Sequence, residues 1–144
     1  MKRIFSYKNY IAAILMVVFI LFSGMAWAEL AIIVHPSNKA TLTDAQIVNL
    51  FLIKEKKFPN GDKALVVTQE DNNSLFEEFA TKVIKRNPRT VNIVWKKRVF
   101  TGKGKPVYVG VNADVITLVE KNKDAIGYVE GSYVGDSVRV VKKY

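Results

Sequence analysis

Apolar residues along this chain fall into short continuous runs and into longer segments with helical spacing. The run Leu30–Val34 is entirely apolar and is closed by His35-Pro36. A short run that ends at a proline is typical of a β-strand buried on both faces. Four later runs also have the length and composition of strands, although Gly127 interrupts one of them: 64–68, 107–109, 125–129 and 138–141.

Four segments between these runs predict amphipathic helices. The clearest places Phe76, Phe79, Ala80, Val83 and Ile84 at i, i+3, i+4, i+7 and i+8, on one face of a helix capped from within 71–74. The others are expected over 44–52 after a capping box at 43–46, from Asn87-Pro88 onward, and over 113–121 behind a cap at Asn112. Their inward residues are expected to be Ile47, Val48, Leu50, Phe51, Val91, Val94, Trp95, Val99, Val115, Leu118 and Val119.

Strands therefore alternate with helices throughout residues 29–144, without an internal repeat or a linker. Such alternation predicts an α/β fold with three layers, in which helices flank a parallel or mixed sheet. A segment of this length can bury a hydrophobic core without disulfides or a structural metal. We expect one domain over 29–144.

Residues 1–28 have the three-part pattern of a secretory signal peptide. Lys2, Arg3 and Lys8 precede the apolar run Ile11–Phe22, and Ala26-Trp27-Ala28 supplies a small-x-small cleavage site. The apolar run is shorter than the about 20 residues that a helix needs to span a bilayer. Because the chain has no cysteine, we expect export to a bacterial periplasm, where disulfides are optional. After cleavage the protein would not be an integral membrane protein; retention of 1–28 as an anchor is the alternative.

The formal charge of the whole chain is +9, with 22 basic and 13 acidic residues. Three basic residues and no acidic residue lie in 1–28, so residues 29–144 carry 19 basic and 13 acidic residues, a net charge of +6. This balance favours anionic partners such as small oxyanions, acidic proteins or lipid headgroups, while solvated surface lysines are the alternative. Nucleic acid is not expected, since the basic runs lack interleaved stacking aromatics.

Catalytic and metal-binding patterns are missing from the sequence. His35 is the sole histidine and is expected to be a hydrogen-bonded structural residue. Without cysteine or a second histidine, a metal site with nitrogen and sulfur ligands is not expected, nor is any other cofactor. No nucleophile and base can be paired, so we do not expect an enzyme. The glycine-rich segment 101–105 follows a helix rather than a strand, unlike a nucleotide-binding loop.

The segment 69–74 is the candidate ligand site, because it connects a strand to the start of a helix. Open α/β sheets bind ligands at this edge, and the N–H groups of a helix N-terminus attract anions. Asn72, Asn73 and Ser74 could add hydrogen bonds from their side chains. Simple capping of the helix explains the same three residues without a ligand.

Several motifs resemble the phosphate-binding branch of the type II periplasmic binding proteins of ABC importers. They are Ala31–Asn38, Leu42–Phe51, which looks like that family's "L-T-x-x-Q-(L/I)-x-x-I-F-x-G-K" helix, and Ala125–Val129, which matches its "A-I-G-Y-V" strand. The resemblance implies a periplasmic solute-binding domain that works with an ABC permease. Members of that family have two lobes, and residues 29–144 are long enough for only one of them. The resemblance therefore implies a single lobe with a mixed sheet flanked by helices.

The resemblance breaks at the oxyanion site. The family binds its oxyanion through an "S-G-T-R" run. When this chain is aligned with the family on Phe79, the same four positions hold Asn73, Ser74, Leu75 and Phe76. Gln69 stands where another family arginine would be. Loss of an arginine removes a charge-assisted donor, which contributes about 1.5–3 kcal/mol per hydrogen bond. The resemblance therefore implies weak or degenerate oxyanion binding.

Two functions remain open at the level of sequence. In the first, the protein binds an oxyanion weakly at Asn72, Asn73 and Ser74, helped by Lys103 or Lys105, or by a dimer that rebuilds a cleft. In the second, the lobe has lost its ligand and acts as a non-transporting adaptor or sensory partner of a membrane or envelope protein. An exposed Phe76 would support the second function.

Overall fold

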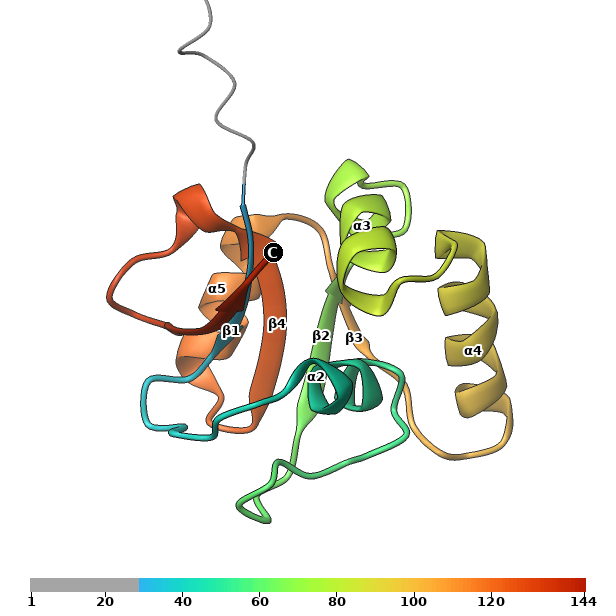
Figure 1. The fold of residues 1–144 in the computed structure, drawn as a ribbon, viewed down its shortest axis with the longest axis horizontal. Helices are drawn as coiled ribbons and strands as arrows, with labels where there is room; N and C mark the ends of the chain where they lie inside the picture. Colours follow the sequence, from blue (N-terminus) through green and yellow to red (C-terminus); the bar gives the residue numbers. More distant parts are fainter. Residues whose placement is uncertain (1–28) are drawn as a thin grey trace, which may run out of the picture.

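The computed structural model describes residues 29–144; the predicted signal peptide, 1–28, lies outside the described residues. The described part contains a five-stranded sheet with helices on both faces (Figure 1). The strands are β1 Leu30–Val34, β2 Leu65–Gln69, β3 Val107–Val109, β4 Ala125–Glu130 and β5 Arg139–Lys143. The helices are α2 Asp44–Phe51, α3 Ser74–Phe79, the π-helix η1 Ala80–Ile84, α4 Pro88–Phe100, α5 Asn112–Lys121 and the 3₁₀ turn η2 Gly131–Tyr133.

The sheet is mixed and has the strand order β3-β2-β4-β1-β5. β2 lies between β3 and β4 and is parallel to both. β1 lies between β4 and β5 and is antiparallel to both. The carboxyl ends of β2, β3 and β4 therefore meet at one edge of the sheet. The mixed α/β architecture expected from the alternation of strands and helices is confirmed.

Side chains of β1 alternate between two hydrophobic cores, as the pleat of a strand requires. Leu30, Ile32 and Val34 belong to the larger core, which packs against α2, α3, η1 and α4. Ala31 and Ile33 belong to the smaller core beneath α5. All five residues are fully buried, so the prediction of a strand covered on both faces is confirmed.

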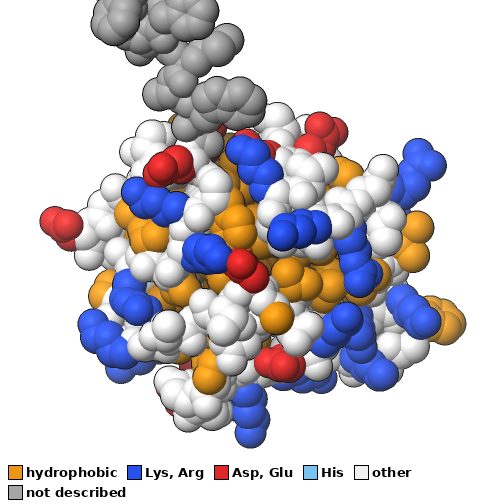
Figure 2. All heavy atoms as spheres, in the orientation of Figure 1, with side chains coloured by type: hydrophobic (Ala, Val, Ile, Leu, Met, Phe, Trp, Pro, Cys, Tyr) orange, Lys and Arg blue, Asp and Glu red, His pale blue; other side chains and the backbone are white. Residues whose placement is uncertain are grey.

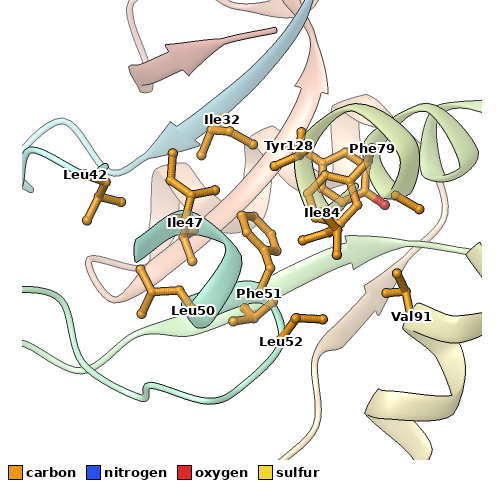
Figure 3. Close-up of a cluster of buried hydrophobic side chains, with 14 of the residues drawn as sticks. Ile32, Leu42, Ile47, Leu50, Phe51, Leu52, Phe79, Ile84, Val91 and Tyr128 are labelled. Atoms are coloured by element: carbon orange, nitrogen blue, oxygen red, sulfur yellow. The ribbon is translucent and has the colours of Figure 1, made fainter. Parts of the chain in front are cut away.

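An aromatic cluster forms the centre of the larger core (Figure 3). The rings of Phe51 and Phe79 meet edge to face at 4.8 Å between centroids. Trp95 donates a 2.8 Å hydrogen bond from its indole nitrogen to the carbonyl of Phe51, which ties α4 to the end of α2. Helix α2 itself begins at the predicted capping box: Thr43 accepts from the backbone of Gln46, and the Gln46 side chain accepts from the backbone of Thr43.

Some local predictions are wrong. Val99, expected to face inward, is 52 % exposed, because the buried side of α4 is formed by Val91 and Trp95 and its last turn extends past the core. The second helix becomes a π-helix at Ala80, although its apolar stripe is buried as expected. The last strand, expected over 138–141, runs from Arg139 to Lys143.

Candidate functional site

The candidate site lies where β2 ends at Gln69 and α3 begins at Ser74. The neighbouring strand β4 ends at the same edge, and α5 begins there after β3. Figure 1 shows the N-terminus of α3 beyond the head of the β2 arrow. The fold therefore provides the helix N-terminus at a strand edge that the sequence predicted.

Gln69 is fully buried at this edge and is held by three hydrogen bonds. Its amide nitrogen donates to the side-chain oxygen of Asn112 at 2.9 Å and to the carbonyl of Tyr128 at 3.3 Å. Its amide oxygen accepts from the side chain of Asn73 at 2.7 Å. Both amide protons and the carbonyl oxygen are used within the protein, so the side chain of Gln69 makes an internal structural contact.

Tyr128 fixes the same edge from the core side. Its hydroxyl lies 2.9 Å from the hydroxyl of Thr68 and accepts from the backbone N–H of Gln69 at 3.2 Å. Burial raises the pKa of Tyr128 to about 12, despite the opposing effect of these hydrogen bonds. The phenol therefore stays neutral at physiological pH and acts as a structural donor and acceptor.

Asn112 does not cap α5, which corrects the prediction from the sequence. Val111 occupies the N-cap position, and its backbone N–H donates to the carboxylate of Asp114 at 3.3 Å. The side-chain oxygen of Asn112 instead accepts from Gln69 and from the backbone of Glu130 at 3.2 Å. Asn112 thus links three elements at the strand edge.

The three predicted residues of the α3 N-terminus have different surroundings. Asn73 is the N-cap, and its side-chain oxygen accepts from the backbone of Leu75 at 2.8 Å, which confirms the capping interpretation for this residue. Asn72 and Ser74 are exposed, and within residues 29–144 their side chains make no hydrogen bond. Ser74 also keeps a backbone N–H that donates to no group in that range.

A shallow hollow of about 360 Å³ includes Asn72, and it is electrostatically mixed. Lys96 of α4 supplies one positive charge, which the sequence reasoning missed because Lys96 is distant along the chain. Glu70 and Asp71 supply two negative charges. Asp71 accepts a 3.3 Å hydrogen bond from Asn92. Burial, with a smaller effect of Asp71, raises the pKa of Tyr108 in the same hollow.

Lys103 is not brought together with Asn72, Asn73 and Ser74. It lines a groove with Lys105 at the start of β2, beside Leu65, whereas Asn73 lies beyond the end of this strand. Leu65 and Gln69, at the two ends of β2, are four residues apart, which corresponds to about 13 Å at about 3.3 Å per residue. The cation that the fold places beside Asn72 is Lys96.

Leu75 and Phe76, which the sequence resemblance aligned with a polar run, belong to the core. Leu75 is 5 % exposed and Phe76 is fully buried, with its ring 5.8 Å from that of Trp95. The exposed Phe76 that would have supported an adaptor function is therefore absent. These two side chains pack in the core and do not form an apolar patch at the strand edge.

The sole histidine of the chain, His35, makes local hydrogen bonds. His35 accepts from the backbone of Ser37 at 3.0 Å through Nδ1, which also lies 2.7 Å from the Ser37 hydroxyl, so the prediction of a hydrogen-bonded histidine is confirmed. Between residues 29 and 144 no three acidic, histidine or cysteine side chains gather in a way that could hold a metal ion. Of the helices in the same range, none combines the length and the apolar character needed to cross a membrane.

No protein-family model matches this chain, and no curated protein sequence matches it. Solved structures do. A protein from Clostridium perfringens assigned as a phosphate ABC transporter substrate-binding protein, with bound phosphate, is 24 % identical with a TM-score of 0.62. An ABC-type phosphate transport receptor from Vibrio cholerae is 21 % identical with a TM-score of 0.53, and PstS from Borrelia burgdorferi is 15 % identical with a TM-score of 0.59.

The matches cover 80 % of this chain but 45 %, 46 % and 47 % of the three solved chains, so the protein spans about half the length of each. At these identities the likeness concerns the fold. Residues 29–144 have the fold of a single lobe of a phosphate-binding protein, as the motifs in the sequence led us to expect.

Proposed function

We propose that residues 29–144 form an exported lobe of the solute-binding type, which holds a small oxyanion weakly at Asn72 and Ser74. The observation that carries the proposal is the set of free donors at the start of α3: the side chains of both residues and the backbone N–H of Ser74. They lie at the carboxyl edge of β2, where open α/β sheets bind ligands. Lys96 would supply the nearby positive charge.

Binding at this position is expected to be weak for three physical reasons. No arginine lines the hollow, so no bidentate charge-assisted contact is available. Glu70 and Asp71 repel an anion from the same hollow. The hollow is also open to water, where the attraction between opposite charges is several-fold weaker than in a closed cleft.

Calorimetry with inorganic phosphate and sulfate, on protein purified from an exporting bacterium, tests this proposal. We expect dissociation constants in the millimolar range. Ser74→Ala should weaken the binding, and Asp71→Asn should strengthen it, because this substitution removes a repelling charge. Lys103→Gln is the matched control and should leave the affinity unchanged, because Lys103 lines a different groove. Absence of heat at millimolar ligand would exclude a transport receptor and with it an ABC permease as partner.

The second candidate function is a non-transporting adaptor or sensory protein that docks onto an envelope protein. The hydrogen bonds of Gln69 favour this function. Gln69 stands where the resemblance places a ligand-binding arginine, yet its side chain binds Asn112, Tyr128 and Asn73 of the same protein. Pull-down from envelope extracts should then recover a reproducible partner, and failure to recover one counts against this function.

Export and removal of residues 1–28 complete the proposal. The protein recovered from the periplasmic fraction is expected to begin at Glu29, which mass spectrometry of the intact chain would establish. An intact N-terminus in the membrane fraction would support the anchored alternative. Analytical ultracentrifugation with and without phosphate would reveal a dimer that rebuilds a cleft.

A further inference from the structure

Helix α4 presents an outward face that combines basic and apolar residues without any acidic residue. The helix contains Arg89, Lys96, Lys97 and Arg98 and neither aspartate nor glutamate. Val91 and Trp95 form its buried side. At 100° per residue, the opposite side carries Arg89, Ile93, Lys96, Lys97 and Phe100. Ile93 is 58 % exposed and Phe100 is 92 % exposed.

More cations surround the end of this helix. A hollow of about 330 Å³ is lined by basic residues together with Val94 and Thr101, and it contains no acidic residue. A second groove, of about 380 Å³, shares Lys103 with the first and contains Glu55 as its acidic residue. The basic residues of the two are Lys54, Lys56, Lys57, Lys63, Arg86, Lys97, Arg98, Lys103 and Lys105.

These cations lack partners of opposite charge. The ion pairs within residues 29–144 join Lys82 to Glu78, Lys142 to Asp44 and Lys143 to Glu29, so none involves the basic residues of either hollow. Figure 2 shows lysine and arginine side chains interleaved with hydrophobic ones along the edge of the molecule formed by α4. An unneutralised cluster of this kind attracts anionic surfaces and raises the rate of encounter with them.

Phe100 distinguishes this surface from an ordinary solvated basic face. A single exposed apolar residue needs no explanation. Phe100, however, lies within one helical turn of Lys97 and directly before the basic loop 101–105, and Ile93 lies on the same side of the helix. Binding at a membrane surface increases with the apolar area that enters the interface and with the attraction of lysine and arginine to anionic lipids, and this side of α4 offers both.

We propose that the outward face of α4 and the loop 101–105, here called the α4 docking face, bind the surface of an anionic phospholipid bilayer. Phe100 inserts among the headgroups, and Lys97 and Lys103 lie against lipid phosphates. The cations are spread over a helix and two loops, which matches an extended anionic surface rather than one small ion. The proposal does not depend on oxyanion binding, since neither Phe100 nor Lys97 nor Lys103 lines the hollow of Asn72.

Co-sedimentation with phosphatidylcholine vesicles, with and without phosphatidylglycerol, tests the α4 docking face. Every variant is purified from the periplasmic fraction of an exporting bacterium, as for the calorimetry, so that all variants carry the same N-terminus. We expect binding that requires phosphatidylglycerol and weakens with added salt. The variant Lys97→Gln/Lys103→Gln should lose affinity by about fivefold for each charge. Phe100→Ser should lose about tenfold, because the ring no longer leaves water.

Matched controls remove two lysines and one aromatic ring at positions outside the α4 docking face. Lys121→Gln/Lys123→Gln removes two exposed lysines near the end of α5, on the other face of the sheet, and Tyr133→Ser removes a ring that is 51 % exposed. Both controls should bind as the parent chain does. Equal binding to vesicles with and without phosphatidylglycerol overturns the proposal. So does an unchanged affinity of Phe100→Ser together with loss in the lysine variant, which would indicate a purely electrostatic surface suited to an acidic protein.

Discussion

The ring of Tyr128 lies flat against the ring of Phe79, with 3.9 Å between centroids and 5° between planes. Tyr128 comes from β4 and Phe79 from the last residue of α3, so the stack joins the sheet to the helix that follows the candidate site. The hydroxyl of the same tyrosine contacts Thr68 and Gln69 at the end of β2. The side chain of Tyr128 therefore contacts both the end of β2 and the helix α3 that follows it.

Removing only that hydroxyl should destabilise the protein. Tyr128→Phe keeps the stacked ring but leaves the buried N–H of Gln69 and the buried hydroxyl of Thr68 without this partner. We expect the free energy of unfolding to fall by about 1–3 kcal/mol, measured by urea denaturation. Tyr133→Phe, at an exposed ring, is the control and should change little. Equal stability of the two variants would contradict the role assigned to Tyr128.

The neighbouring asparagines 72 and 73 should respond differently to the same substitution. Asn73→Ala removes the cap of α3 and the partner of the Gln69 amide oxygen, so we expect a loss of about 2 kcal/mol in the free energy of unfolding. Asn72→Ala removes an exposed side chain without hydrogen bonds to the described residues and should be nearly neutral. Thermal unfolding followed by circular dichroism distinguishes the two, and a reversed order would refute the assignment of the cap.

Gly127 allows α5 to approach β4 closely. A Cβ atom at this position would lie 2.7 Å from Cγ1 of Val115, well inside van der Waals contact. Gly127→Ala should therefore cost about 1–3 kcal/mol of stability. The double variant Gly127→Ala/Val115→Ala should recover part of this loss, because the second change removes the clashing methyl group. Gly135→Ala, where a Cβ meets no atom within 4 Å, is the control.

Asp44 should make stability depend on acidic pH. Hydrogen bonds from Lys142 and Tyr144 lower the pKa of Asp44 from its ordinary 3.8. Because the folded pKa is lower than the unfolded one, the stabilisation is complete above about the ordinary value and is lost as the pH falls through the folded pKa. The difference in free energy of unfolding between the parent and Asp44→Asn should be constant near neutral pH and shrink below pH 3.8.

The matched substitution for this pH series is Asp136→Asn. Asp136 is exposed and makes no hydrogen bond or ion pair with the described residues. Its variant should follow the pH profile of the parent chain. If Asp44→Asn also follows it, the contacts of Asp44 with the C-terminal strand do not contribute to stability in solution.

Local chemistry explains why much of the fold could be predicted from the sequence. The capping box of α2 depends on Thr43 and Gln46 alone, and the buried stripe of α3 and η1 is visible as a helical repeat. Val99 could not be placed this way, because its exposure depends on where the core ends beneath α4. A helix that is buried along its full length would show the same spacing of apolar residues as α4.

The candidate site was only partly predictable, because its contacts join residues distant in the sequence. Asn73 could be identified as a cap from its position before an apolar stripe. The side chain of Asn112 was expected to serve its own helix but binds Gln69, 43 residues away. Lys96 and Lys103 are both surface lysines in the sequence, and only the fold shows which one lies beside Asn72.

The central position of β1 has a consequence for how the polypeptide reaches its final shape. β1 is among the first residues of the described range, yet its two neighbours, β4 and β5, are supplied by residues 125–130 and 139–143. Pairings across such long separations close slowly. A nascent chain that stops before Ala125 leaves β1 without either neighbour, so both edges of β1 are paired only after residues 125–130 and 139–143 have been synthesised.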